Sequence, residues 1–373
     1  MGGSFRIGTA PGYLGLTGGP PGSRTVSAPP AHQWRRRDAN VQLERRARAD
    51  SMTGSALLRV LTEALAVDLG TTNTRIYSPG RGVVLNEPSA VALHRYTGQV
   101  VAVGSEAYGL FGREPLDVAV HLPIRAGAIE NVDAAERMLE AFVRLACAGR
   151  FRRRRLVVGV PGSSTPLEQR AVRNAAVDAR AAHVDLVDSG LAAALGANVA
   201  DDEQAHLVVD IGGGTTDVAV VVGPYVVASS SVKVGGDLID AAIQDYVHGE
   251  FGMLLGERAA EHLKRAAGAA VEPGDAATHK IVGKRLTDGF PKAVNVSAEA
   301  VHEAIRPVLH RMTEATRLVV ERLTPDTIAD IYDTGITLTG GGALLRGLED
   351  YFHESLDLAV QVSNEPATAA VVG

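Results

Sequence analysis

The sequence has one cysteine, no excess of basic residues and no long apolar run. Because Cys147 is the single cysteine among 373 residues, no disulfide can form within the chain, and the cytosol is the expected compartment. A net charge of −6 argues against binding of nucleic acid by the chain as a whole. No window reaches the roughly 18 to 20 uninterrupted apolar residues of a membrane span, so an integral membrane protein is not expected.

Signatures of several enzyme classes are also missing. The eleven histidines show no HExxH or paired metal-ligand spacing, so no zinc site is expected. No GxSxG or Cys–His pattern indicates nucleophilic hydrolysis. What is present is a globular composition, with 46% hydrophobic and 21% charged residues, over a length that allows about two domains with cores of their own.

Charge is spread unevenly along the chain. Residues 1–51 carry a net charge of +5 and the remainder −11, and residues 1–37 contain no acidic residue. Residues 1–30 hold eight glycines and five prolines, which break regular structure. We expect residues 1–54 to be a disordered basic extension of an acidic globular body. A translation start at Met52 and a targeting segment are the alternatives.

Three short segments are candidates for contact with a membrane surface. Residues 55–64 place their leucines on one face of a predicted helix that Ser55 caps, and Leu110-Phe111 forms a second apolar site. A run of arginines between residues 150 and 155 precedes a predicted buried strand. Each segment can touch anionic or apolar parts of a membrane. Packing on the body, or ordinary solvation of the arginines, is the alternative that the sequence favours.

Two segments repeat the same layout 142 residues apart. In the first, a strand ends at Asp68, and a Gly-Thr-Thr turn leads into a second strand from Asn73. In the second, a strand ends at Asp210, and a Gly-Gly-Gly-Thr turn leads into a strand that continues to Val222. The repetition predicts a duplicated domain in which each half carries one glycine hairpin.

The residue types of both hairpins suit phosphate binding. Glycines let backbone N–H groups approach phosphate oxygens closely, and Thr and Asn side chains add donors. A carboxylate at each strand end can hold a water of a hydrated Mg²⁺ ion. Two such hairpins that face each other would hold a triphosphate from both sides.

Two further features are less specific. A strand at 336–339 runs into three glycines and then a helix expected from about Ala343, whose N-terminus suits the adenosine side of a nucleotide. A tight turn without a ligand is the alternative. Glu261 and Lys264 lie three residues apart on a helix predicted from Gly256. They either bracket a ribose or base, or form an ordinary surface pair.

Taken in order, these segments resemble the actin/Hsp70/sugar-kinase superfamily and, within it, the bacterial MreB/Mbl family of rod shape-determining actin homologues. The resemblance extends from about Ala66 to Gly373. The runs specific to the family are Gly82–Ser89, Arg170–Arg173, Ser231–Asp237, Leu255–Arg258 and Thr339–Gly347. The resemblance implies an actin-like α/β fold of two related halves, each with a mixed sheet flanked by helices, and a nucleotide in the cleft between them.

The resemblance also assigns residues to the cofactors ATP and Mg²⁺. Those implied to meet the phosphates are Thr71, Thr72, Asn73, Gly212, Gly213, Gly214 and Thr215. Those implied to surround the ribose and base are Gly236, Asp237, Glu261, Lys264, Gly341, Gly342 and Ala343. Asp68 and Asp210 are implied to lie near Mg²⁺.

The chain departs from the family where the catalytic acid is expected. The family carries Glu-Glu-Pro before an alanine run, and its second Glu positions the water that attacks the γ-phosphate; here Asp188-Ser189-Gly190 precede that run. Serine is shorter and uncharged, so Ser189 cannot act as the same base. We expect ATP binding with slow or absent hydrolysis. Asp188, or Asp210 with a water, is the alternative that would restore hydrolysis.

The resemblance also implies a domain plan. Its segments are an extension at 1–54, domain I at 55–205 with a small outer subdomain at about 95–130, domain II at 206–345 with one at about 246–318, and a C-terminal segment at 346–373 that returns to domain I.

The implied function is that of a cytoskeletal subunit. Such proteins polymerise head to tail on the inner face of the cell membrane and direct peptidoglycan synthesis during growth or in the spore wall. The implied partners are other copies of the chain, the membrane surface and cell-wall synthesis proteins, without nucleic acid, in a cytoplasmic and peripheral location. A sugar-type kinase, a chaperone ATPase and a non-hydrolysing regulatory paralogue are the alternatives within the superfamily.

Overall fold

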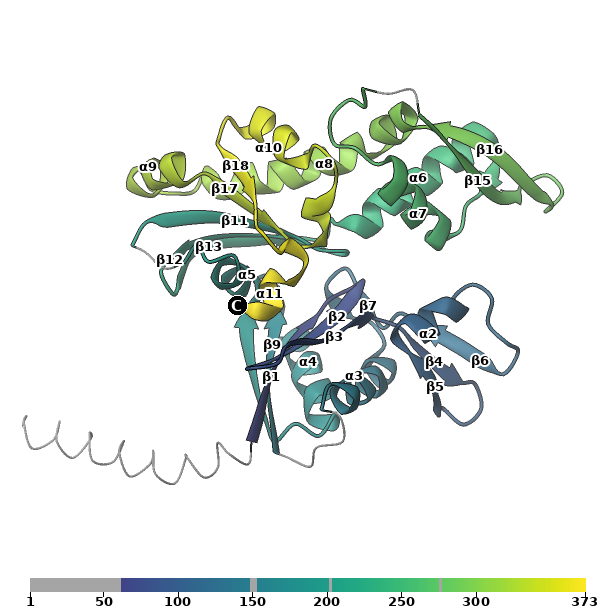
Figure 1. Cartoon of the computed structure of the whole chain (residues 1–373), viewed down its shortest axis with the longest axis horizontal. Coiled ribbons are helices and arrows are strands. Elements are labelled where there is room, and N and C mark those ends of the chain that lie inside the picture. Colours follow the sequence, from purple (N-terminus) through teal and green to yellow (C-terminus); the bar gives the residue numbers. More distant parts are fainter. Residues whose placement is uncertain (1–61, 148–152, 201–202, 275–276) are drawn as a thin grey trace, which may run out of the picture. The chain divides into compact units, whose positions relative to one another are not determined.

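The computed structural model describes residues 62–147, 153–200, 203–274 and 277–373. Two five-stranded sheets form the centre of this part of the chain (Figure 1). The extension predicted at 1–54, the rest of the chain before Thr62 and the first arginines of the 150–155 run lie outside the described residues.

The first sheet has the strand order β10-β9-β1-β2-β3. Its strands are β1 (Thr62–Leu69), β2 (Asn73–Ser78), β3 (Gly82–Pro88), β9 (Arg153–Val160) and β10 (His183–Asp188). Strands β1, β9 and β10 run parallel, whereas β2 and β3 are antiparallel to their neighbours. In β1, Leu65 and Val67 are buried on one face, as the two-residue period of a strand requires.

The second sheet repeats this arrangement with the order β18-β17-β11-β12-β13. Its strands are β11 (Ala205–Ile211), β12 (Thr216–Val222), β13 (Tyr225–Val232), β17 (Ile336–Thr339) and β18 (Val360–Val362). Strands β11, β17 and β18 run parallel, and the hairpins β11–β12 and β12–β13 are antiparallel. Because order and direction match strand for strand, the predicted fold of two related halves with mixed sheets is confirmed.

Helices cover both sheets. They are α3 (Val132–Ala146), α4 (Pro166–Asp178), α5 (Ser189–Gly196), α6 (Gly236–Phe251), α7 (Glu257–Ala267), α8 (Ala298–Val320), α9 (Pro325–Thr334), α10 (Leu348–Leu356) and α11 (Ala369–Val372). Side chains cap two of these helices: the Thr165 side chain accepts from the Glu168 backbone N–H, and the Ser297 side chain accepts from that of Ala300.

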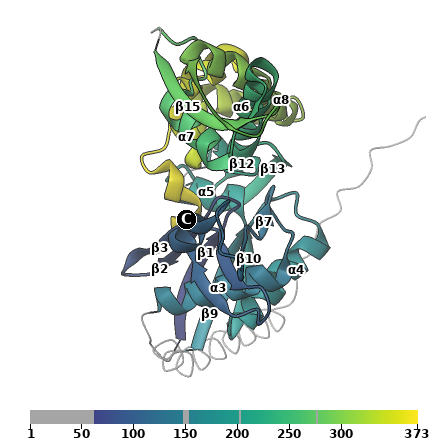
Figure 2. The ribbon, with the colours of Figure 1, turned by 90° about the vertical axis from the view of Figure 1, so that its right-hand side faces the viewer.

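Two helices lie between the sheets. Helix α5 contacts β10 of the first sheet and β11 and β12 of the second, and the C-terminal α11 packs on α5 and reaches β1 (Figure 2). The short helix η2 (Pro366–Thr368) leads into α11. These contacts bring the last residues of the chain back to the first sheet, although the predicted domain boundaries themselves stay a prediction.

Each half also carries a smaller outer sheet. Beside the first sheet, β4 (Val91–His94), β5 (Val100–Val103) and β6 (Val118–His121) pair, with α2 (Gly104–Leu110) against them. Beside the second, β14 (Met253–Leu254), β15 (Thr278–Arg285) and β16 (Pro291–Ser297) pair, with α6 and α7 nearby. The hairpin of β7 (Ile124–Arg125) and β8 (Ala128–Ile129) follows β6.

The start of β1 differs from the sequence prediction. A helix was expected through Ala64, but residues 62–64 are already strand and pair in parallel with residues 153–155 of β9. The arginines 153–155 therefore lie within β9 instead of before it. Strand pairing prevails over the local helical pattern here. Within this strand Glu63 is buried and forms an ion pair of 2.6 Å with Arg81.

Two observations bear on membrane contact. No helix within the described ranges has the length and apolar character that a membrane span requires. The Phe111 ring stacks on Tyr108, with ring centres 6.1 Å apart and planes 8° from parallel, and Leu110 is half-buried. This packing favours the interpretation of Leu110-Phe111 as part of the body.

Candidate functional site

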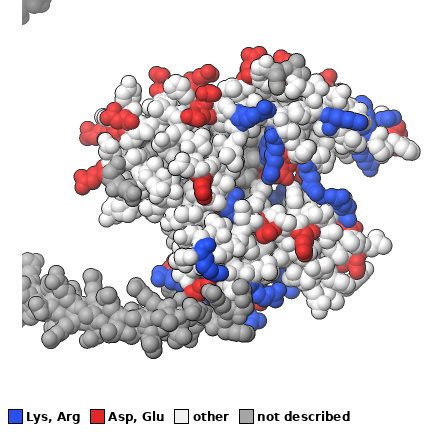
Figure 3. Space-filling view, in the orientation of Figure 1, with Lys and Arg blue, Asp and Glu red and all other residues white. Residues whose placement is uncertain are grey.

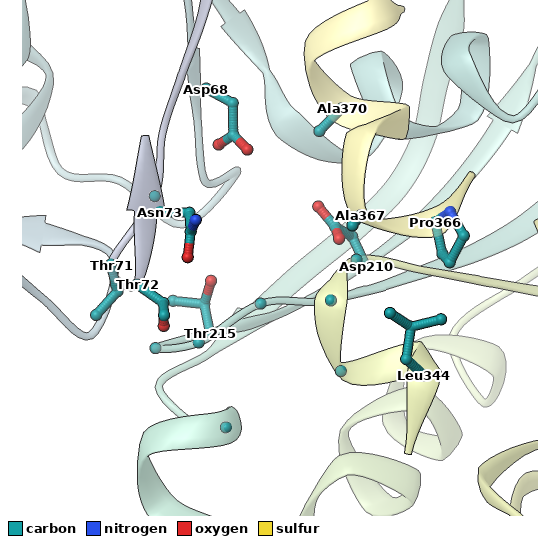
Figure 4. A pocket seen from close by; sticks show the side chains of 18 of the residues that line it. Asp68, Thr71, Thr72, Asn73, Asp210, Thr215, Leu344, Pro366, Ala367 and Ala370 are labelled. Atoms are coloured by element: carbon teal, nitrogen blue, oxygen red, sulfur yellow. The ribbon is translucent and has the colours of Figure 1, made fainter. Parts of the chain in front are cut away.

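A cavity of about 480 Å³ lies where the glycine turns of the two sheets meet. Its lining comes from the β1–β2 turn, the β11–β12 turn, the start of α6, helix α7 and the glycines after β17. Figure 4 shows the Asp68 and Asp210 carboxylates directed toward the open space, with Thr71, Thr72, Asn73 and Thr215 beside it. The two hairpins predicted to face each other therefore do so.

The two turns approach each other so closely that side chains are excluded. A Cβ atom on Gly213 would overlap Thr72 Oγ1, and one on Gly214 would overlap Thr71 Oγ1. Thr71 Oγ1 in turn accepts a hydrogen bond of 3.0 Å from the Gly127 backbone N–H. Glycine is thus required at 213 and 214 to bring the backbone amides of one turn against the hydroxyls of the other.

The carboxylates at the strand ends lie in different surroundings. Asp68 pairs with Arg75, whose Nη1 lies 3.0 Å from Asp68 Oδ2. Burial raises the pKa of Asp68, and the charge of Arg75 opposes this effect. Burial also raises the pKa of Asp210 well above its usual value, and the neighbouring charges of Asp217 and Asp68 add to the shift. Because carboxylates crowd here, the cavity favours a cation.

The donor set fits a hydrated Mg²⁺ ion. No cluster of three or more potential His, Cys, Asp or Glu ligands occurs in the described part of the chain, so a fully protein-ligated metal is not indicated there. Mg²⁺ keeps several waters and takes one or two carboxylates together with substrate phosphates. Asp68 and Asp210 supply this number of carboxylates at the cavity wall.

The glycine turn after β17 differs in detail from the prediction. Instead of an α-helix from about Ala343, a single 3₁₀ turn, η1, spans Gly341–Leu344. Gly341 and Gly342 line the cavity, whereas Ala343 is buried and is not part of the lining. A helix does not continue because the backbone is already extended at Leu345, so the turn offers little helix dipole.

Glu261 and Lys264 both line the cavity but do not pair with each other. Lys264 Nζ lies 2.7 Å from Asp240 Oδ2 and donates to the Gly236 carbonyl at 3.1 Å. Glu261 Oε1 accepts from Arg265 at 2.6 Å, and its Oε2 accepts from the Tyr108 hydroxyl. Of the two alternatives, a surface pair between Glu261 and Lys264 is not formed, because each side chain faces a different partner.

A second cavity, of about 650 Å³, adjoins the first. Asp237 lines this cavity, together with Arg125, Asp240, Glu257 and Arg258, whereas Gly236 lines the first one. Figure 3 shows blue Lys and Arg side chains gathered along the hollow, with red side chains among them. Burial raises the pKa of Asp237, and the charges of Lys264 and Arg125 oppose the shift.

Ser189 lies at the cavity wall, at the first position of α5. The preceding Asp188 caps this helix, with Oδ1 accepting from the Leu191 backbone N–H at 3.1 Å. Asp188 is not part of the cavity lining. Its carboxylate is engaged in the cap, which does not favour the alternative in which Asp188 acts on a water at the cavity.

Several cavity residues were not predicted from the sequence, and two of them are charged residues on the hairpins. Arg75 faces Asp68 across the first hairpin, and Asp217 faces Asp210 across the second. Asp217 is 6% exposed; Oδ2 accepts from Thr215 Oγ1 at 2.9 Å, and Oδ1 is buried without a hydrogen-bond partner. The signal was available, because each residue follows its strand-end Asp by the same seven positions.

Comparison with known proteins identifies the family. The model of the MreB/Mbl protein family matches residues 62–373. The cell shape-determining protein Mbl of Bacillus subtilis is 37% identical over 311 residues, which cover 83% of this chain and 93% of that protein. The cell shape-determining protein MreB of Escherichia coli K12 is 39% identical over 317 residues, covering 83% and 91% of the two chains.

A solved structure agrees with these relatives. The crystal structure of MreB5 of Spiroplasma citri bound to AMPPNP superimposes with a TM-score of 0.77 at 29% identity, covering 83% of this chain and 94% of that one. Fold, matched hairpins and sequence therefore lead to one assignment: the chain belongs to the MreB/Mbl family of actin-like, cell shape-determining proteins.

Proposed function

We propose that this chain binds ATP with Mg²⁺ in the cavity between its two glycine hairpins. The observation that carries the proposal is the contact of the Gly213-Gly214 turn with Thr71 and Thr72, which brings the backbone of one turn and the hydroxyl side chains of the other to the wall of one cavity. The S. citri relative bound to AMPPNP supports it.

The proposed ligand contacts follow the lining. Thr71, Thr72 and Asn73 meet the phosphates from the first hairpin, and the Gly212–Gly214 turn with Thr215 meets them from the second. Gly236, Glu261 and Lys264 take the ribose side, and Gly341 and Gly342 close over the base. Asp237 and Ala343 have at most an indirect role, since neither lines this cavity. Asp68 and Asp210 hold waters of Mg²⁺.

We propose that ATP turnover is slow. Ser189 lies at the cavity wall in the place of a family glutamate, and its hydroxyl cannot take a proton from water as a carboxylate can. Asp188 is held in the helix cap. Without a catalytic carboxylate, the site can still bind the nucleotide and stabilise the charge of its phosphates through the hairpins.

Assembly is the second part of the proposal. Subunits bind head to tail and form open filaments, because a repeated contact whose rotation does not close gives a helix. Exposed apolar side chains at the β15–β16 hairpin, Val282, Leu286 and Phe290, offer surface for such contacts. We place the filaments at the inner face of the cell membrane, where they organise peptidoglycan synthesis together with cell-wall proteins and so determine cell shape.

Two measurements test the proposal together. Titration of the purified chain with ATP and Mg²⁺ is expected to show binding, and electron microscopy with sedimentation is expected to show nucleotide-dependent filaments. If the chain binds ATP but stays monomeric, the nucleotide-binding part of the proposal holds and the assembly part fails. Transfer of phosphate from ATP to a sugar, without filaments, would instead identify a small-molecule kinase of the superfamily.

A further inference from the structure

Arg75 is a cationic side chain of the first glycine hairpin. It lies on β2, its side chain is 16% exposed, and it forms part of the cavity wall. One of its nitrogens, Nη1, donates to Asp68 at 3.0 Å. Its Nε is buried and has no hydrogen-bond partner. A buried guanidinium N–H without a partner is costly, so the site has an unused donor.

The two matched hairpins carry opposite charges at the same position. Asp68 stands opposite Arg75 in the first hairpin, and Asp210 stands opposite Asp217 in the second. Side chains directly opposite each other in an antiparallel pair lie on the same face of the sheet. One hairpin therefore presents a cation beside its carboxylate, and the other presents two carboxylates.

A triphosphate in this cavity needs a nearby positive charge. The acidic residues of the wall, Asp68, Asp210 and Asp217, repel a ligand with several negative charges of its own. Arg75 already acts on this cluster, because its charge lowers the pKa of both Asp68 and Asp210 against the effect of burial. The planar guanidinium has five donors, and its fork matches phosphate oxygens.

We propose that Arg75 is a phosphate-binding residue of this cleft, which donates to the terminal phosphates of the nucleotide while it stays paired with Asp68. The inference rests on the proposed nucleotide binding and adds to it a protein cation beside Mg²⁺. One consequence is that the chain retains measurable affinity for ATP when Mg²⁺ is removed. A second consequence is that the contribution of Arg75 to binding affinity increases with the number of phosphates on the ligand.

The alternative is that Arg75 serves only as the counter-ion of Asp68. Both functions place the guanidinium beside the carboxylate, so a loss of stability on mutation does not separate them. The two alternatives differ in how ligand affinity depends on phosphate number, because a mere counter-ion affects adenosine and ATP through the same change of local structure.

The test is a ligand series measured on the full chain by calorimetry. Adenosine, AMP, ADP and ATP are titrated with Mg²⁺ and again in EDTA, into the wild type, Arg75→Leu and Arg75→Lys. The matched control is Arg265→Leu, which removes the same charge at the Glu261 end of the same cavity. Melting temperatures show that each variant is folded.

Arg75→Leu is expected to lower ATP affinity in EDTA by about 10- to 100-fold, as the loss of charge-assisted hydrogen bonds implies. The loss should decrease from ATP through ADP and AMP and vanish for adenosine. Arg265→Leu should change the affinity for all four ligands by about the same factor. Arg75→Lys keeps the charge without the fork, so it should give an intermediate loss with the same order.

Three results would overturn the inference. An equal loss for all four ligands on Arg75→Leu would leave Arg75 as a counter-ion, and so would an unchanged ATP affinity. If Arg75→Leu does not fold, Asp68→Asn decides in EDTA: ATP affinity should be kept or raised, and a loss refutes a direct role for Arg75. If the wild type binds none of the nucleotides, the proposed nucleotide binding itself fails. That result is distinct from a failure of the role of Arg75, in which the wild type still binds.

Discussion

The Tyr108 hydroxyl donates a hydrogen bond of 3.0 Å to Glu261, joining α2 of the first outer sheet to α7 of the second. Arg258, also on α7, strengthens this contact. Its guanidinium lies 5.6 Å above the Tyr108 ring centre and donates to the Gly109 carbonyl at 3.3 Å. Burial and the adjacent Glu261 carboxylate raise the pKa of Tyr108, so the hydroxyl keeps its proton. The hydrogen bond between Tyr108 and Glu261 thus links the two halves beside the cavity, and Glu261 also lines that cavity.

Tyr108→Phe is expected to speed nucleotide release. The substitution keeps the ring under Arg258 but removes the hydrogen bond to Glu261, which frees both the carboxylate and the relative motion of α2 and α7. Loss of one hydrogen bond to a charged acceptor predicts a release rate about 3- to 30-fold higher. Stopped-flow fluorescence with a labelled nucleotide measures it directly.

The control for this prediction is Tyr96→Phe, which removes a hydroxyl from a residue of the same outer part that is 85% exposed. Its release rate should equal that of the wild type. Equal rates in the wild type and Tyr108→Phe would show that the Tyr108–Glu261 contact does not restrain the nucleotide.

Ser189→Glu is expected to raise ATP turnover. Ser189 faces the cavity, and Gly159 leaves space next to it, since a Cβ there would lie 3.3 Å from Ser189 Oγ. A carboxylate at this position can orient the attacking water and take its proton, which predicts phosphate release about 100-fold faster. The measurement is phosphate release at saturating ATP.

Ser163→Glu supplies the matched control, because Ser163 is exposed and outside the cavity lining. It should leave the slow wild-type rate as it is. Rapid turnover by the wild type itself would refute the assignment of Ser189 and would favour Asp210 with a water as the base.

Local patterns in the sequence were sufficient to predict the two glycine hairpins. A strand that ends in Asp before a glycine turn is a short-range signal. The duplication also followed, because the same layout recurs. These features depend on residues close in the chain, and tertiary contacts did not override them.

The side-chain partners of the site could not be predicted in this way. Lys264 pairs with Asp240, 24 residues away, and Tyr108 with Glu261, 153 residues away, so both pairs depend on how separate elements pack. The strand at Thr62 is a similar case, since its pairing with β9 comes from a segment 91 residues later. Only the fold determines which of several compatible local structures such residues adopt.

The Lys264–Asp240 pair predicts a large stability effect. The two side chains are 18% and 15% exposed and lie 2.7 Å apart. Lys264→Met leaves a buried carboxylate without its cation, which should lower the free energy of unfolding by about 3 kcal/mol at neutral pH. Asp240→Asn in the same background should recover part of this loss, because the isolated charge is removed. Urea denaturation of the two single variants and the double variant gives the coupling energy.

Lys233→Met is the control, because Lys233 is 67% exposed and its nearest carboxylate oxygen, on Glu168, lies at 3.8 Å. Its stability should match that of the wild type. Additive effects of Lys264→Met and Asp240→Asn would contradict the prediction, since they would mean that the two groups do not interact.

Asp217 predicts an unusual dependence of stability on pH. Burial raises the pKa of Asp217 from 3.8 to about 6, against the hydrogen bonds from Ser231 and Thr215, and the charges of Asp188 and Asp68 add to the shift. The folded chain then binds more protons than the unfolded chain between these values, so this group costs stability as pH rises from about 4 to about 6. Asp217→Asn should be about 3 kcal/mol more stable than the wild type at pH 8 and nearly equal to it at pH 4. Asp185→Asn is the control of opposite sign, because Arg155 lowers the pKa of Asp185 at the surface. Urea denaturation across this pH range decides, and a gain on Asp217→Asn that is the same at both ends would show that the Asp217 carboxyl does not titrate as its burial requires.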